Sequence, residues 1–293
     1  MPQSERTHRP RRAVLYVPAS NDKAIAKIPS LACDTVIFDL EDAVAPEAKA
    51  AARERLKAWF AARPQHGPEC VIRVNPLSGE WGRDDLAAVC ASAPDAVLLP
   101  KVNTPRDISD FDDALDEAVA PDSLKVWIMV ETPKAMLNIG ALAELGRDRA
   151  ARLDCFVAGT NDLVKDTGVL ATADRRYIMP WLLQMVLAAR AGGLDVLDGV
   201  SNDFRDLDAF ARECAEGAAM GFDGKTLIHP AQIEPALKAF SPSADAIAEA
   251  QAIRLAFARP ENAEKGVISI DGKMVERLHL AQAERLLARA GRI

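Results

Sequence analysis

The chain has 293 residues, of which 49% are hydrophobic and 27% charged, the balance of an ordinary soluble globular protein. Its net charge of −7 argues against a nucleic acid or an anionic membrane surface as the main partner. No apolar run approaches the roughly 20 residues that a membrane span requires. The five cysteines lie singly, without a C-x-x-C pair, which predicts reduced thiols in a cytoplasmic protein rather than a disulfide framework or a zinc site.

Short β-rich runs alternate with helical segments along most of the chain. The predicted strands are residues 14–18, 34–40, 70–75, 96–102, 125–131, 153–159, 194–200 and 220–228. Several are continuously apolar in their middles, as expected of strands buried on both faces of a parallel sheet. The segments 47–63, 107–119 and 174–193 have the composition and spacing of helices, and the last ends at Gly192 and Gly193.

Eight strand–helix alternations in roughly 230 residues favour a closed (β/α)₈ barrel over an open, doubly wound sheet. The turn after the first strand, PASNDK, lacks the glycine-rich fingerprint of a dinucleotide-binding domain. We therefore predict an α/β fold, with a catalytic TIM barrel over residues 1–240 and a C-terminal helical extension over residues 241–293. The extension is predicted to contain a helix ending before Pro260, a short stretch GVISIDGKMV and a last helix. It would act as a lid, mediate oligomerisation or pack as a plain helix pair.

Charged side chains follow the predicted strands at the barrel end where chemistry takes place. Glu41 and Asp42 follow the second strand, Arg73 lies in the third, Glu131 ends the fifth and Asp162 follows the sixth. Carboxylates gathered at one rim repel one another unless a cation lies among them. Mg²⁺, held by one or two carboxylates and water, would neutralise them and leave room for an oxygen-rich substrate.

Each of these residues also has a purely structural interpretation. Glu131 precedes Thr-Pro, a helix-start signature, and Asp162 follows a tight turn where it could cap a helix. Two acids after neighbouring buried strands nevertheless favour a shared metal. Arg73 lies within an apolar strand and needs an anionic partner, which is a substrate carboxylate, a thioester carbonyl or a structural pair with Glu41 or Asp42.

Three further residues are not predicted to be catalytic. His229 follows the last strand as a single histidine, which favours a structural hydrogen bond over a catalytic base. The basic run RTHRPRR (6–12) is interpreted as a solvated tail, although its last residues, Arg11 and Arg12, adjoin the first strand and could contact phosphate groups.

Seven segments resemble, in the same order, motifs of the citrate lyase β-subunit-like family of the HpcH/HpaI aldolase superfamily, which includes malyl-CoA and citramalyl-CoA lyases. The segments are RAVLYVP (12–18), DLED (39–42), RVN (73–75), LPK (99–101), VETP (130–133), GTNDL (159–163) and GFDGK (221–225) with IHP (228–230). Together they cover almost the whole chain.

The resemblance implies a Mg²⁺-dependent TIM barrel, usually a homotrimer or hexamer, that breaks or forms a carbon–carbon bond next to a CoA thioester. Glu131 and Asp162 match the metal ligands of the family. Arg73 matches its substrate-binding arginine, and Glu131 borders the substrate as well. Glu41 and Asp42 match acids that hold water bound to the metal.

The resemblance also implies an acid that protonates the enolate carbon. In the family it is the aspartate of a C-terminal Gly-x-Met-Ile/Val-Asp motif, commonly offered by a neighbouring subunit. Here the motif is GKMVE (272–276), with Glu276 at the aspartate position. Glu276 is the first candidate for this acid and Asp271 the second, and the departure also allows an altered activity.

The predicted function is retro-Claisen cleavage of a 3-hydroxyacyl-CoA with an adjacent carboxylate, of the malyl-CoA, citramalyl-CoA or citryl-CoA type. Hydrolysis of the thioester and a malate-synthase-like condensation are alternatives on the same scaffold. Another class is a non-autonomous citrate lyase β subunit that acts on an acyl-carrier-protein thioester, or a regulator that binds a CoA ester. Loss of the metal site would favour the regulator, but Glu131 and Asp162 are both present.

Overall fold

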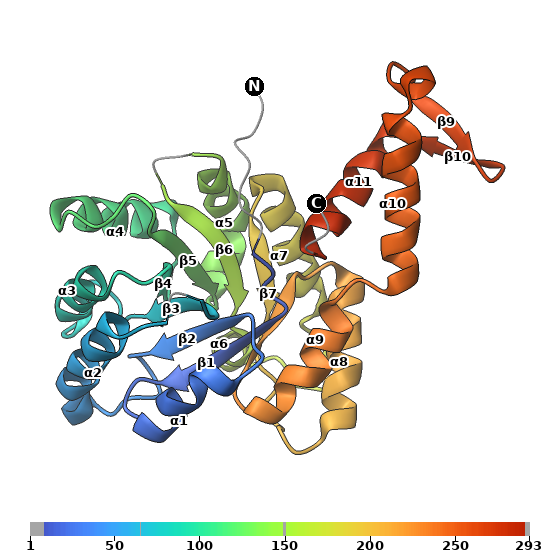
Figure 1. Cartoon of the computed structure of the whole chain (residues 1–293). Coiled ribbons are helices and arrows are strands. Elements are labelled where there is room, and N and C mark those ends of the chain that lie inside the picture. The colour runs from blue at the N-terminus through green and yellow to red at the C-terminus, as the bar shows by residue number, and fades with distance from the viewer. Residues whose placement is uncertain (1–8, 65, 149–150, 291–293) are drawn as a thin grey trace. The chain divides into compact units, whose positions relative to one another are not determined.

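A closed barrel of eight parallel strands forms the centre of the protein, seen here in a computed structural model that describes residues 9–64, 66–148 and 151–290 (Figure 1). Neighbours in sequence are neighbours in the barrel, and the last strand pairs with the first. The fold class predicted from the alternation is confirmed, and all eight predicted strands are present. They are β1 (Ala13–Pro18), β2 (Thr35–Asp39), β3 (Glu69–Arg73), β4 (Ala96–Leu99), β5 (Lys125–Val130), β6 (Leu153–Ala158), β7 (Asp195–Asp198) and β8 (Gly224–Leu227).

Helices follow each strand and lie outside the barrel (Figure 1). They are α1 (Asp22–Lys27), α2 (Lys49–Ala61), α3 (Gly82–Ser92), α4 (Pro105–Glu117), α5 (Pro133–Glu144), α6 (Thr160–Thr167), α7 (Met179–Gly192), α8 (Leu207–Met220) and α9 (Ile233–Phe240). The predicted end of the 174–193 helix is confirmed, because Gly193 caps α7 in the left-handed conformation that glycine adopts without strain.

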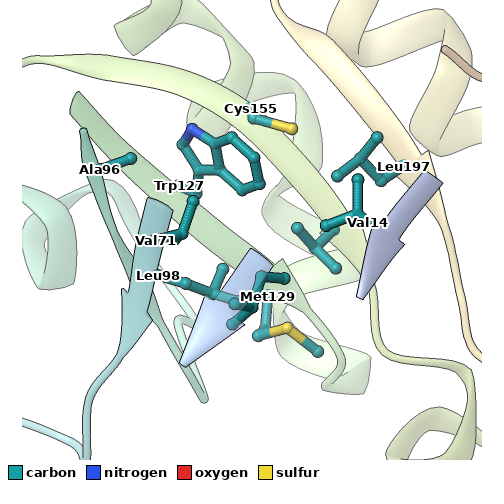
Figure 2. Close-up of a cluster of buried hydrophobic side chains, with 10 residues drawn as sticks. Val14, Val71, Ala96, Leu98, Trp127, Met129, Cys155 and Leu197 are labelled. Carbon is teal, nitrogen blue, oxygen red and sulfur yellow. The ribbon is translucent and has the colours of Figure 1, made fainter. Parts of the chain in front are cut away.

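The barrel interior is filled by apolar side chains rather than open (Figure 2). Seven strands contribute buried residues to one cluster, which comprises Val14, Ile37, Val71, Ala96, Leu98, Trp127, Met129, Cys155, Val157 and Leu197. Strands covered on both faces explain the continuously apolar runs in the sequence. A packed interior leaves the rim at the carboxyl ends of the strands as the place where polar side chains can meet a ligand.

Arg11 closes the other end of the barrel and does not face a phosphate site. Its guanidinium lies 2.7 Å from Glu69, 2.6 Å from Asp154 and 2.7 Å from Asp195, and it stacks 4.5 Å from the centre of the Trp127 ring. Three carboxylates at the amino ends of β3, β6 and β7 therefore satisfy this buried cation. The idea that Arg11 contacts phosphates is wrong, because the strand register places it on the floor of the barrel.

A second compact unit begins at Phe240, one residue before the predicted extension. It contains α10 (Ala244–Ala258), the antiparallel pair β9 (Val267–Ile270) and β10 (Lys273–Glu276), and α11 (Arg277–Arg289). Asp271 and Gly272 form the tight turn of the hairpin, both with positive φ (49° and 77°). Ala256, Phe257, Ile268 and Val275 form a small core inside this unit.

In the part of the chain that the structure describes, no helix is long and apolar enough to cross a membrane. All five cysteines are free thiols, and four of them are buried.

Candidate active site

The carboxyl ends of the strands surround a cleft of about 390 Å³. Four of the predicted site residues line it: Asp42, Arg73, Glu131 and Asp162. Glu41 lies beside them in contact with Arg73, whereas Glu276 belongs to the second unit. The full lining is Tyr16, Pro18, Asp39, Asp42, Ala43, Arg73, Met129, Glu131, Ala158, Gly159, Thr160, Asn161, Asp162, Val200, Asn202, Thr226 and Ile228.

Arg73 is held in the cleft by a partner that sequence analysis missed. Asp39 is its register partner on the neighbouring strand β2, and the carboxylate accepts two hydrogen bonds, from Nε at 2.7 Å and Nη2 at 2.6 Å. The guanidinium also lies 5.1 Å above the Tyr16 ring. Burial is the largest effect and disfavours the charged form of Arg73, but the hydrogen bonds to Asp39 and the charges of Asp39 and Glu41 together raise the pKa of the guanidinium. This fork-to-fork pair fixes the plane of the cation.

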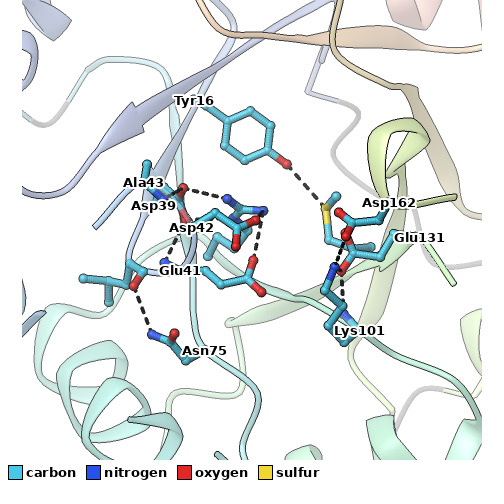
Figure 3. A network of polar contacts seen from close by, with 12 residues as sticks. Tyr16, Asp39, Glu41, Asp42, Ala43, Asn75, Lys101, Glu131 and Asp162 are labelled. Carbon is cyan, nitrogen blue, oxygen red and sulfur yellow. Dashed lines mark hydrogen bonds and ion pairs between the residues drawn. The ribbon is translucent and has the colours of Figure 1, made fainter. Parts of the chain in front are cut away.

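Glu41 and Asp42 lie beside the same arginine (Figure 3). Nη1 of Arg73 is 3.0 Å from Glu41 Oε2 and 3.5 Å from Asp42, so the expected structural pairs exist alongside the pair with Asp39. Glu41 Oε2 accepts no hydrogen bond from any described residue, because its contact with Arg73 is an ion pair without hydrogen-bond geometry. Burial raises the pKa of Glu41 to about 8, and Arg73 only partly opposes the rise. The buried Lys49 ammonium fixes this loop by donating to the carbonyls of Leu40 and Glu41.

Glu131 and Asp162 come together on the other side of the cleft, as predicted for two acids at neighbouring strand ends. Lys101, which follows β4, lies between them (Figure 3). Its ammonium is 2.6 Å from Asp162 Oδ1 and 3.5 Å from Glu131 Oε1, and its backbone N–H donates to the same Glu131 oxygen at 2.7 Å. Burial raises the pKa of Glu131 in spite of these contacts. For Lys101, the hydrogen bond to Asp162 and the charge of Glu131 outweigh burial and raise its pKa.

The helix-capping alternatives for these two acids do not hold. Thr132 caps α5 with its hydroxyl, which accepts a hydrogen bond from the N–H of Ala135. Gly159 is the first residue before α6, and Asp162 lies inside its first turn. Neither carboxylate therefore serves as a helix cap.

Gly159 brings the end of β6 close to Glu131. A Cβ atom at this position would lie 2.2 Å from Glu131 Cβ and 2.9 Å from its Oε2. Real Cβ atoms do not come so close, so only glycine allows this approach without displacing Glu131. The glycine of the GTND segment thus serves the geometry of the acid pair.

The paired carboxylates fit Mg²⁺ and do not fit a zinc centre. Among the residues that the structure describes, no group of three or more His, Cys, Asp or Glu side chains could hold a metal unaided. Structural zinc takes four protein ligands, whereas Mg²⁺ is commonly held by one or two carboxylates with water. The ammonium between Glu131 and Asp162 shows that the pair attracts a cation.

His229 has the structural role expected for it. Its Nδ1 accepts a hydrogen bond from the N–H of Ala231 at the start of a 3₁₀ turn (Pro230–Gln232), and its ring stacks on Phe204 with centroids 4.6 Å apart.

Glu276 caps α11 within the second unit. Its side chain accepts a hydrogen bond from the N–H of His279, and His279 Nδ1 accepts one from the Glu276 N–H at 2.9 Å. The GKMVE motif thus also marks a helix start, a function that the sequence had not suggested. Its role as an acid stays a prediction.

Asp39 and Lys101 lie within motifs of the sequence, but their functions were not predicted from it. A signal existed for each: Asp39 precedes Glu41 in DLED, and Lys101 is the charged end of an apolar strand. Neither pattern shows which of several nearby charges is the partner.

A (β/α)₈ barrel whose strand ends carry a buried arginine and paired carboxylates has the architecture of a barrel enzyme with its active site at this rim. Residues 12–230 match the profile of the HpcH/HpaI aldolase/citrate lyase family, and the chain belongs to this family.

Relatives of known name extend over nearly the whole chain. A (3S)-malyl-CoA thioesterase of Cereibacter sphaeroides is 43% identical over 281 residues, which are 96% of this chain and 95% of the relative. The mitochondrial citramalyl-CoA lyase of Homo sapiens is 35% identical over 96% of this chain and 86% of its own length. The structure of the CitE protein of Mycobacterium tuberculosis in complex with magnesium, acetoacetate and coenzyme A is similar, with a TM-score of 0.73 and 30% identity, and the match covers 95% of this chain and 97% of that chain. The predicted family and the prediction of an enzyme of the carbon–carbon lyase class are confirmed.

Proposed function

We propose that this chain is a Mg²⁺-dependent carbon–carbon lyase acting on a 3-hydroxyacyl-CoA thioester whose hydroxyl neighbours a carboxylate, of the malyl-CoA, citramalyl-CoA or citryl-CoA type. The observation that carries the proposal is the single cleft in which Arg73 faces the acid pair Glu131 and Asp162. A hydroxyl and a carboxylate on adjacent carbons can bind one cation together, while an arginine binds the thioester oxygen.

Glu131 and Asp162 would hold the Mg²⁺. When bound, the ion would supply Lewis-acid stabilisation of negative charge on the substrate's hydroxyl oxygen. Glu41 and Asp42, which lie beside Arg73 across the cleft from this pair, would hold water bound to the metal. Glu131 also borders the substrate, because its side chain lines the cleft.

In the reaction, the hydroxyl gives its proton to water in the cleft and its carbon becomes a carbonyl. The bond to the carbon next to the thioester breaks, and its electron pair passes to the thioester as an enolate. Arg73 would stabilise the enolate oxygen, and Asp39 would keep the guanidinium oriented for this task. We assign the proton that the enolate carbon takes up to Glu276 of a neighbouring subunit, with Asp271 as second choice.

The last assignment requires an oligomer, and we propose a homotrimer or hexamer. Support comes from apolar side chains exposed on the adjacent helices α5 and α7: Leu137 is 87%, Leu183 48% and Leu187 72% exposed. Exposed apolar groups of this kind mark interaction surfaces. Light scattering on the purified protein tests the assembly, and a monomer at assay concentration would contradict both the oligomer and the acid from a neighbouring subunit.

Thioester hydrolysis is the second candidate, favoured by the 43% identity to a protein named (3S)-malyl-CoA thioesterase. It needs no carbon–carbon cleavage, and the acyl group leaves as a free acid together with CoA. The same cleft could serve it, since Arg73 would then stabilise charge on the thioester oxygen during attack by water.

One experiment separates the two. Malyl-, β-methylmalyl-, citramalyl- and citryl-CoA are incubated with the protein and Mg²⁺ in H₂¹⁸O, and the products are identified by mass spectrometry. A lyase yields a shorter acyl-CoA and an oxo acid, and no free CoA thiol appears in the initial phase of the reaction. A hydrolase yields free CoA and an ¹⁸O-labelled hydroxy acid. Acetyl-CoA with glyoxylate tests condensation followed by hydrolysis, and acyl-carrier-protein thioesters test the carrier. If no thioester gives a product with or without Mg²⁺, a regulator that binds a CoA ester becomes the better hypothesis.

A further inference from the structure

Lys101 contacts Glu131 through both its backbone N–H and its side-chain ammonium. Its φ of 54° lies in the left-handed region that residues other than glycine rarely adopt. This turn directs the backbone N–H at Glu131 Oε1, 2.7 Å away, and leaves the ammonium 3.5 Å from the same oxygen. The chain thus leaves β4 in a strained conformation that brings one lysine onto the buried acid.

The ammonium spans the gap between a buried and a partly open acid. The Glu131 side chain is 1% exposed and that of Asp162 25%, while that of Lys101 is 36% exposed. Two carboxylates this close repel each other, and the lysine charge offsets the repulsion. Because Lys101 is a point charge on a long flexible stem that already reaches solvent, it can leave the pair without rearranging the strands.

We infer that Lys101 is an internal counter-ion of the metal site, which keeps Glu131 and Asp162 in place without metal and is displaced when Mg²⁺ binds. The inference rests on the proposed function, because it takes these two acids as the metal ligands. The ammonium and Mg²⁺ would compete for the same two carboxylates, so each would weaken the binding of the other, and the coupling is reciprocal. Lys101 thereby lowers the Mg²⁺ affinity and keeps the two acids together when no Mg²⁺ is bound.

Calorimetric titration of the metal-free protein with Mg²⁺ tests the competition. Lys101→Met keeps the length of the side chain and removes its charge, and should bind Mg²⁺ roughly tenfold more tightly than the wild type, equivalent to about 1.4 kcal/mol. Its thermal midpoint without metal should fall, because the acids are then unneutralised, and should rise more on addition of Mg²⁺. Unchanged or weaker Mg²⁺ binding by Lys101→Met would overturn the inference.

Lys165→Met is the matched control. Lys165 is exposed on α6, the helix that carries Asp162, and makes no ion pair with any residue that the structure describes. Its substitution removes the same charge near the site without removing the contact. A tenfold gain in this control as well would mean that net charge, not displacement, sets the affinity, and would also overturn the inference.

A second readout uses the wild-type chain, so it does not depend on how a variant folds. Acetylation of lysines is followed by mass spectrometry with and without Mg²⁺. Release of the ammonium should raise the acetylation rate of Lys101 several-fold, while Lys165 is unaffected. Glu131→Gln should abolish the effect of Mg²⁺. A Lys101 rate that stays constant or falls contradicts displacement.

The metal site and the counter-ion role of Lys101 can be refuted separately. If the wild type binds Mg²⁺ through Glu131, but neither the Lys101→Met substitution changes the Mg²⁺ affinity nor Mg²⁺ changes the acetylation rate of Lys101, the counter-ion role is wrong and the metal site stands. If the wild type binds no Mg²⁺, the metal site and the counter-ion role are both wrong.

Discussion

The substitution Gly159→Ala should lower the free energy of unfolding of the protein and weaken its Mg²⁺ binding. The added Cβ would lie 2.2 Å from Glu131 Cβ, 2.9 Å from Glu131 Oε2 and 3.1 Å from Met129 Cε. Carbon atoms in contact are about 3.5–4.0 Å apart, so Glu131 must recede by about 1.5 Å. Its side chain is almost fully buried, so the adjacent strands must separate, and overpacking of this kind costs about 1–3 kcal/mol.

The same displacement should disturb the ligand geometry. Mg²⁺ requires oxygen ligands at about 2.0–2.1 Å in a nearly ideal octahedron, and a carboxylate moved by more than 1 Å cannot supply one. We therefore expect Mg²⁺ affinity to fall at least about tenfold, the equivalent of about 1.4 kcal/mol.

Urea unfolding followed by tryptophan fluorescence, together with calorimetric titration, measures both effects. Gly140→Ala is the control, since Gly140 is exposed on α5 with no atom within 4 Å of its would-be Cβ. Alanine in a helix should stabilise this position by about 0.5–1 kcal/mol, so the same chemical change has opposite signs at the two sites. A Gly159→Ala protein with wild-type unfolding and wild-type Mg²⁺ affinity would refute the close approach of β6 to Glu131.

Three further outcomes are expected. Arg73→Lys keeps the charge but loses the planar fork, so turnover should fall by on the order of a hundredfold with the fold intact by circular dichroism, and normal turnover would make Arg73 a structural residue only. Asp112 is buried on α4, has no hydrogen-bond partner among the described residues and lies 3.9 Å from Arg152; burial raises its pKa to about 7. Because the folded form binds this proton more tightly than the unfolded chain, the stability contributed by Asp112 is lost as pH rises from about 4 to about 7. Asp112→Asn should then be about 1–2 kcal/mol more stable than the wild type at pH 8 and not at pH 4, and urea midpoints that differ equally at both pH values would disprove the shift. Glu276→Gln should abolish exchange of acetyl-CoA methyl protons in deuterated buffer with a keto-acid analogue bound, without loss of Mg²⁺ or analogue binding, whereas normal exchange in both Glu276→Gln and Asp271→Asn would place the acid in the barrel.

The amino-acid pattern alone predicted the architecture and the gathering of most charged side chains of the candidate site at one rim. Eight apolar runs separated by amphipathic segments leave few alternatives to a (β/α)₈ barrel. In that fold every strand delivers its carboxyl end to one rim, so Arg73, Glu131 and Asp162 could be placed together without knowledge of a single contact. The end of α7 at Gly193 could also be predicted from the local sequence, because a left-handed cap depends on the residue that occupies it.

The choice of partners was decided only by the tertiary structure. Asp39 binds Arg73 because the two are register partners on neighbouring strands, and a shift of one residue would have turned either side chain to the other face. Lys101 lies between Glu131 and Asp162 because of a positive φ that its residue type does not predict. The sequence offers several oppositely charged candidates as the partner of each charged side chain. Strand register and backbone direction decide which candidate comes close, and the energy of an ion pair depends on distance and burial.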